Sequence, residues 1–240
     1  MQRKNLMIGS IPAILWGDVS EKLFIVVHGD KSNKADNTTV IFAEEATKLG
    51  YQVLSFDLPE HGDRVNETYP CKVQNGIKDL NCIMHYAQLR FTNISLFACS
   101  VGAYFSLLAY KNDELKQCLF LSPIVDMEGI IDKMMSWFGI SEDRLQVEKE
   151  ISTPIGHTLY WDYYCYVKKH PIVNWSVPTS ILYGSEDDIS EFEVISSFSN
   201  RFNCHLDILK NGEHFFYSEK QLDYFRRWLK NRLKKQDNRI

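Results

Sequence analysis

The chain has 240 residues, 45% of them hydrophobic, which is enough for one domain with a large buried core. Its net charge of -4 argues against a nucleic-acid-binding protein, because such proteins carry a basic patch or stripe. No stretch approaches the roughly 18 uninterrupted apolar residues of a membrane span, so we expect no membrane association.

The six cysteines are scattered and show no Cys-x-x-Cys spacing, which is typical of a reduced chain, so we expect a cytoplasmic location. The apolar N-terminal stretch follows Arg3 and Lys4 as in a signal peptide, but Gly9 and Pro12 interrupt it. We therefore expect residues 1–16 to form two short strands joined by a turn.

Short apolar runs alternate with longer helical patterns along the rest of the chain. The runs predict strands at residues 23–27, 52–56, 94–97, 118–121, 180–183 and 206–209. The intervening patterns predict helices at residues 38–49, 72–89, 101–110, 190–202 and 218–234. Apolar strands that alternate with helices predict an α/β fold with a doubly wound, mostly parallel sheet. Ligands of such sheets bind beyond the carboxyl ends of the strands.

Residues 122–175, after the sixth strand, are too many for an ordinary crossover. Helical patterns at residues 126–137, 141–151 and 160–169 predict that this insertion forms a small helical cap. Residues 1–121 and 176–240 would then form the core. The insertion is rich in aromatic residues, and four of them are expected to bind substrate: Trp137, Phe138, Tyr160 and Trp161. The alternative is that these rings only attach the cap to the core.

The most informative motif is Ala98-Cys99-Ser100-Val101-Gly102, between a predicted strand and a predicted helix. A serine nucleophile on such a turn needs small residues two positions before and after it, which Ala98 and Gly102 provide. The first amides of the helix, that of Val101 among them, can then stabilise an oxyanion beside Ser100. Taken alone, a motif of this kind also occurs by chance in α/β proteins.

An acid and then a histidine follow Ser100, in the order that a catalytic triad on such a sheet requires. Asp187 and Asp188 lie in the loop after one predicted strand, and His214 lies in the turn after the next. His214 would accept the serine proton, and a carboxylate would orient the imidazole. The motif and the chain order together favour covalent hydrolysis.

Other candidate residues fit catalysis less well. With Cys99 as the nucleophile, the bulky Phe97 and Val101 would flank the tight turn. His28 and His61 are expected to shape loops through hydrogen bonds. The remaining histidines lack the spacing of a metal site and no glycine-rich phosphate loop is present, so we expect neither a metal nor a cofactor.

Two further segments resemble motifs of the α/β-hydrolase family, and the resemblance covers nearly the whole chain. Residues 24–30 (FIVVHGD) are similar to the family's buried strand that ends in His-Gly, and residues 57–63 (DLPEHGD) are similar to its Asp-x-Pro-Gly-His-Gly loop. The sequence departs from the family at Glu60 and Ala98, where glycine is usual, and at Cys99, where a larger residue is common.

The resemblance implies roles for individual residues. It implies that Asp187 is the acid of the triad, with Asp188 as the alternative. It also implies that the backbone N–H of Asp30 joins that of Val101 in an oxyanion hole, with the N–H of Lys31 as the alternative second donor.

These residues predict a serine hydrolase that cleaves a carboxylic ester of a small molecule through an acyl-enzyme. A thioesterase or a small-peptide hydrolase is the alternative among enzymes, because the pocket rather than the triad selects the leaving group. A non-catalytic binding protein on the same fold is the third possibility. The aromatic insertion favours aryl or medium-chain acyl groups.

Overall fold

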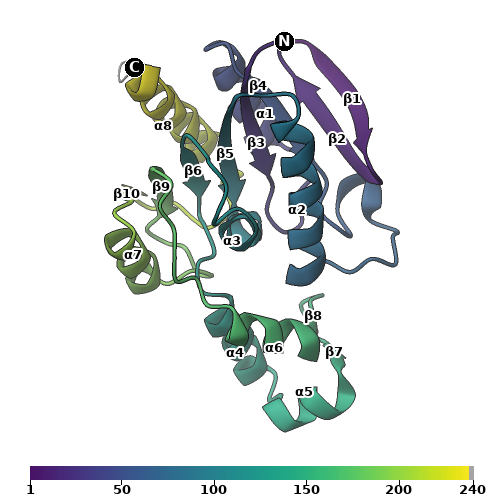
Figure 1. The fold of residues 1–240 in the computed structure, drawn as a ribbon. Coiled ribbons are helices and arrows are strands. Elements are labelled where there is room, and N and C mark those ends of the chain that lie inside the picture. The colour runs from purple at the N-terminus through teal and green to yellow at the C-terminus, as the bar shows by residue number, and fades with distance from the viewer. Residues whose placement is uncertain (238–240) are drawn as a thin grey trace.

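The computed structural model describes residues 1–237, and within them eight strands form one mostly parallel sheet, as predicted (Figure 1). The strands are β1 (Arg3–Ile8), β2 (Ile11–Trp16), β3 (Lys22–Val27), β4 (Gln52–Phe56), β5 (Asn93–Cys99), β6 (Cys118–Leu121), β9 (Thr179–Gly184) and β10 (His205–Leu209). Their order across the sheet is β1-β2-β4-β3-β5-β6-β9-β10. Strands β1 and β2 form an antiparallel edge, and the strands from β4 to β10 run parallel.

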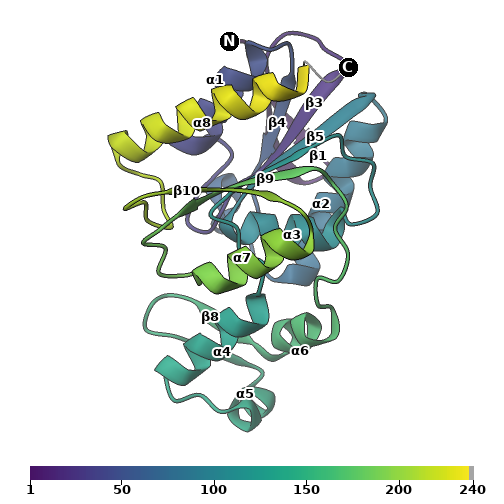
Figure 2. The ribbon, with the colours of Figure 1, turned by 90° about the vertical axis from the view of Figure 1, so that its left-hand side faces the viewer.

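The central strands are apolar because helices cover both of their faces. Figure 2 shows α1 (Asn37–Thr47) and α8 (Glu219–Asp237) on one side of the sheet, and α2 (Val73–Gln88), α3 (Ser100–Ala109) and α7 (Phe192–Arg201) on the other. A short 3-10 helix, η1 (Gly62–Arg64), follows β4. Each side of the sheet has its own apolar cluster. No helix within the described residues is both long and apolar enough to cross a bilayer.

The segment between β6 and β9 folds over the carboxyl ends of the parallel strands (Figure 1). It contains α4 (Met127–Trp137), α5 (Glu142–Glu148), β7 (Glu150–Ser152), β8 (Thr158–Tyr160) and α6 (Trp161–Lys169). We call residues 122–175 the cap and the rest of the chain the body; of the predicted core range, residues 238–240 lie outside the described residues. Apolar side chains of the cap, such as Ile131, Leu145 and Tyr164, belong to the same buried cluster as those of α2 and α3.

The helix predicted at residues 141–151 is wrong beyond Glu148. Lys149 has a φ of +68°, which an L residue rarely adopts, and this residue ends α5. The chain then turns through Gly156, and β7 pairs with β8 as a small antiparallel hairpin. The β-branched residues and Pro154 in this stretch fit a hairpin better than a helix.

We expect Gly102→Ala to destabilise the fold, because a Cβ at this position would lie 2.3 Å from the His28 carbonyl oxygen and 2.7 Å from that of Val27. Both atoms belong to backbone, so we expect the free energy of unfolding to fall by about 3 kcal/mol. Gly50→Ala is the control, since Gly50 has a φ of +77° but a Cβ there would meet no heavy atom within 4 Å. Conformational strain alone should cost about 1 kcal/mol there. Urea unfolding measures both losses, and equal losses would contradict this account.

Candidate active site

Ser100 lies at the junction of β5 and α3, at the carboxyl edge of the sheet. Its φ of +48° is unusual for an L residue and fits a sharp strand-to-helix turn. The end of β3 approaches this turn closely, since a Cβ at Gly29 would lie 3.1 Å from the Ser100 Cβ. The hydroxyl is therefore held between the ends of β3 and β5, and only 8% of the residue is exposed.

The loops after β9 and β10 bind each other directly. The Ser185 N–H donates to the Leu209 carbonyl oxygen at 2.9 Å, and the Glu186 N–H donates to that of Gly212 at 2.8 Å. A Cβ at Gly184 would lie only 2.4 Å from the Gly212 oxygen. Because the two backbones approach so closely, the loop that carries the acid and the loop that carries the histidine are fixed relative to each other.

A chain of hydrogen bonds joins Ser100, His214 and Asp187. The His214 Nε2 atom lies 2.8 Å from the Ser100 Oγ atom, and the His214 Nδ1 atom lies 2.8 Å from the Asp187 Oδ2 atom. These distances fit an Nδ1–H that donates to the carboxylate and an Nε2 that accepts a hydrogen bond from the serine hydroxyl. The imidazole and the carboxylate are almost completely buried, which limits competition from water.

The second oxygen of Asp187 is held by backbone amides. Asp187 Oδ1 accepts hydrogen bonds from the Ile189 N–H at 3.0 Å and the Ser190 N–H at 2.8 Å. Asp188 is exposed and forms no hydrogen bond or ion pair with any residue in the described part of the chain. The structure thus brings Asp187, and not the alternative Asp188, to His214.

Two backbone amides near Ser100 are available to an oxyanion. The Val101 N–H lies in the first turn of α3, where amides have no acceptor within the helix. Among residues 1–237 the Asp30 N–H has no acceptor, whereas the Lys31 N–H donates to His61 Nε2 at 3.1 Å. Because the Lys31 amide is already occupied, the geometry favours Asp30 as the second donor.

The Asp30 carboxylate lies near two imidazole rings. Its Oδ1 atom lies 3.4 Å from His61 Nε2, and its Oδ2 atom lies 3.7 Å from Nε2 of His157 in the cap. The side chain is therefore directed toward two imidazoles, and only the backbone N–H of Asp30 is available to an oxyanion.

Two other residues near the site, His28 and Cys99, are poorly suited to a catalytic role. Burial lowers the pKa of His28 to about 4, so the ring is neutral at pH 7. Its Nδ1–H donates to the Gly29 carbonyl oxygen at 2.7 Å, and its Nε2 accepts from the Leu58 N–H at 3.0 Å, which fixes the loops after β3 and β4. Burial also raises the pKa of the Cys99 thiol well above its ordinary value, which disfavours a thiolate nucleophile.

The four aromatic residues that the sequence predicts to bind substrate lie in different surroundings. Trp137 is 62% exposed. Phe138 and Trp161 pack against the large apolar cluster, and the ring of Tyr160 lies 4.9 Å from Lys72 Nζ. Two cavities occur between the cap and α7, and none of the four rings is among the described residues that line them.

Sequence reasoning missed Tyr104, which lines the larger cavity. It follows Ser100 by about one helical turn, and that spacing was the available signal, since residues four apart share a helix face. Within the described residues, no three His, Cys, Asp or Glu side chains lie close enough together to hold a metal ion.

No protein-family model and no curated protein sequence matches the chain. Solved structures match it over nearly its whole length. Est1E from Butyrivibrio proteoclasticus, bound to ferulic acid, is 19% identical, with a TM-score of 0.80 over 98% of this chain and 100% of its own. Mouse alpha/beta hydrolase domain-containing protein 10 is 14% identical, with a TM-score of 0.76 over 98% of this chain and 100% of its own. An esterase from Pyrococcus furiosus is 19% identical, with a TM-score of 0.68 over 98% of this chain and 91% of its own. The chain therefore has the α/β-hydrolase fold, as its motifs predict.

We expect Asp187→Asn to slow the reaction of Ser100 with a fluorophosphonate by about 10⁴-fold, because the amide no longer holds the imidazole in the right tautomer. The matched control is Asp188→Asn, which changes the neighbouring exposed carboxylate and should leave the rate close to that of the wild type. Intact-mass measurement of the labelled fraction against time gives both rates. A large effect of Asp188→Asn, or none of Asp187→Asn, would contradict the assignment.

Proposed function

We propose that the protein is a serine hydrolase that cleaves a carboxylic ester of a small molecule through an acyl-enzyme. The observation that carries this proposal is the hydrogen-bond chain from Ser100 Oγ through His214 to Asp187, with 2.8 Å at each step. A serine hydroxyl is a poor nucleophile until a neighbouring base takes its proton, and this chain supplies such a base.

In the proposed acylation, Ser100 Oγ attacks the ester carbonyl carbon while His214 Nε2 takes the hydroxyl proton. The carbonyl oxygen becomes an oxyanion, which the N–H groups of Val101 and Asp30 would bind; one such donor is typically worth about 3 kcal/mol. Asp187 stabilises the imidazolium. His214 then gives its proton to the alcohol oxygen, the C–O bond breaks, and the acyl group remains on Ser100.

In the proposed deacylation, a water molecule takes the place of the alcohol. His214 Nε2 removes one proton from this water, whose oxygen attacks the acyl carbon, and the same two amides bind the second oxyanion. The bond to Ser100 Oγ then breaks, and His214 returns the proton to the serine. The products are a carboxylic acid and an alcohol, and the protein is regenerated without a cofactor.

Two of the similar solved structures have names that support ester hydrolysis as the reaction. The Pyrococcus furiosus protein is an esterase, and the ferulic acid bound to Est1E is an aromatic carboxylic acid. We extend the proposal to aryl or medium-chain acyl groups because the cap is rich in aromatic side chains. Thioesters and small peptides are the alternative substrates. The free state of all six cysteines supports the cytoplasm as the proposed location.

We expect Ser100→Ala to abolish fluorophosphonate labelling and to reduce turnover of p-nitrophenyl esters by about 10⁶-fold. Cys99→Ala is the matched control, because it removes the adjacent nucleophilic side chain and should keep both reactions. Intact mass and p-nitrophenolate release measure the two effects. Labelling that survives in Ser100→Ala but not in Cys99→Ala would mean that Cys99 is the nucleophile. A wild-type protein that neither reacts with the fluorophosphonate nor hydrolyses the esters would favour a binding protein.

A second test concerns the acyl group. We expect kcat/KM to be higher for hexanoyl and cinnamoyl esters of p-nitrophenol than for the acetyl ester, because apolar surface of the larger groups would be buried against the cap. The three esters share one leaving group, so the comparison isolates the acyl part. Equal values for all three would contradict this preference.

A further inference from the structure

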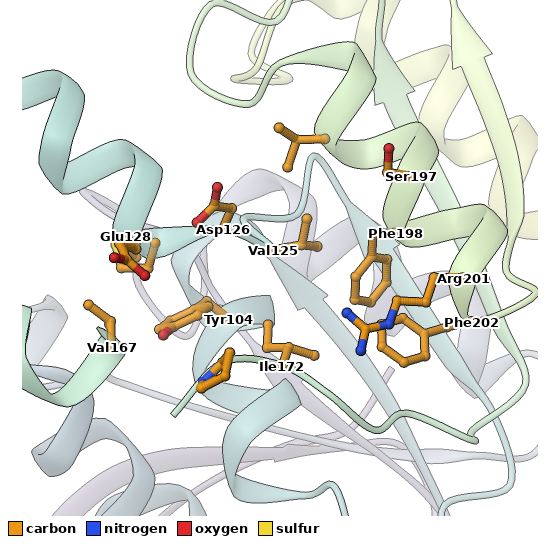
Figure 3. Close-up of a pocket in the computed structure, with 13 residues that line it drawn as sticks. Tyr104, Val125, Asp126, Glu128, Val167, Ile172, Ser197, Phe198, Arg201 and Phe202 are labelled. Carbon is orange, nitrogen blue, oxygen red and sulfur yellow. The ribbon is translucent and has the colours of Figure 1, made fainter. Parts of the chain in front are cut away.

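The larger cavity lies beside the candidate catalytic residues rather than at them. It has a volume of about 250 Å³ and lies between α3 and α7 of the body and the two ends of the cap (Figure 3). The described residues that line it do not include Ser100, His214 or Asp187. A ligand in this cavity would therefore occupy a site separate from the triad.

The walls of the cavity are mainly apolar, but its ends are not. Figure 3 shows the carboxylates of Asp126 and Glu128 on the same side of the cavity as the Tyr104 hydroxyl, with Arg201 at the opposite side. The lining also includes several apolar side chains: Val125, Val167, Ile172, Val194, Phe198 and Phe202. The cavity thus offers apolar walls and one acidic end.

The Tyr104 hydroxyl lacks a partner. The residue is only 3% exposed and lines the cavity, yet its hydroxyl forms no hydrogen bond with any residue that the structure describes. Because this hydroxyl opens onto the cavity, it is available to a group that binds there. Burial, together with the carboxylates of Asp126 and Glu128, raises the pKa of Tyr104 above its ordinary value, so the group stays neutral and its oxygen can accept a hydrogen bond.

The acidic end also lacks a cation. Asp126 caps α4 and accepts a hydrogen bond from the Gly129 N–H at 3.0 Å, while the half-buried Glu128 forms no ion pair among the described residues. Arg201 is the one cationic residue among those that line the cavity, and it donates to the Val173 carbonyl oxygen at 3.4 Å. Two carboxylates and an unpartnered hydroxyl therefore lie at one end of the cavity, and Arg201 lies at the opposite end.

We propose that this cavity is a second ligand site, which takes a small primary amine on an apolar alkyl or aryl body. The ammonium group would donate to the Glu128 carboxylate and the Tyr104 oxygen, close to Asp126, while the apolar body would lie against Val125 and Phe198. Hydrogen bonds to a charged group are roughly twice as strong as neutral ones, which favours an amine over an alcohol. The volume is below the roughly 300–1,000 Å³ of sites for drug-sized molecules, which favours a small ligand.

The site also touches the segments that hold the nucleophile. Tyr104 stands on α3, the helix that begins at Ser100, and the Ile124 N–H, next to Val125 of the cavity wall, donates to the Ser100 carbonyl oxygen at 3.1 Å. Binding of an amine does not require hydrolysis, so this proposal is independent of the proposed function.

The test is a calorimetric titration of 2-phenylethylamine into the full-length wild type and into Ser100→Ala, with 2-phenylethanol and 3-phenylpropionate as comparison ligands. We expect saturable binding of the amine to both proteins, at least about 10-fold tighter than binding of the alcohol. Glu128→Gln should weaken amine binding by about 10-fold, and Tyr104→Phe should weaken it less. The matched control is Asp143→Asn, which removes an exposed carboxylate elsewhere on the cap and should not change binding.

Three outcomes would overturn the proposal. The first is amine binding that is no tighter than alcohol binding, or that is unchanged in Glu128→Gln. The second is tighter binding of 3-phenylpropionate, which would make the site one for an anion near Arg201. The third is loss of amine binding after fluorophosphonate labelling of the wild type, which would place the amine at Ser100. Thermal unfolding of each variant checks that a loss of binding is not a loss of fold. If the wild type binds the amine but hydrolyses no ester, the second ligand site is supported and the proposed function is wrong.

Discussion

The end of β3 and the start of α3 touch through backbone, with no room for a side chain at Gly102. The geometry of the candidate site depends on this contact, because it brings the Ser100 turn, the first amides of α3 and the Asp30 amide to one place. The N-terminal end of a helix carries a partial positive charge, and here it faces the position where an oxyanion would form. The loops after β9 and β10 then add Asp187 and His214 through a similar approach of backbone to backbone.

Much of this arrangement could be predicted from the sequence, because its signals are local. The run at residues 23–27 is apolar throughout, as a strand buried on both faces must be, and the small residues around Ser100 mark a tight turn whatever surrounds it. Other features depend on contacts between distant residues. The choice of Asp30 over Lys31 rests on a hydrogen bond from the Lys31 amide to His61, 30 residues away, which no local pattern encodes. The cavity is similar, since its lining comes from two body helices and both ends of the cap.

Glu60 shows how the chain tolerates a departure from the family that it resembles. The residue stands where glycine is usual and has a φ of +62°, a conformation that costs an L residue roughly 1–2 kcal/mol. Its carboxylate accepts a hydrogen bond from the Cys71 N–H at 2.7 Å, a bond that glycine cannot form. This hydrogen bond to a charged group offsets part of the strain, and its exposure to solvent limits the gain. The substitution therefore connects the loop after β4 to the approach to α2.

The cap and the body share one apolar cluster, and this has a consequence for how the protein moves. A lid that swings away as a rigid unit would keep the contacts within the cap, but it would separate α6 from α2 and expose the apolar side chains between them to water. Full exposure of one large apolar side chain costs about 1.5–3 kcal/mol, so complete opening would cost several kcal/mol. Entry to Ser100 should therefore occur by small local displacements, and the amides of the cap should exchange with deuterium in one cooperative unit with those of α2 and α3.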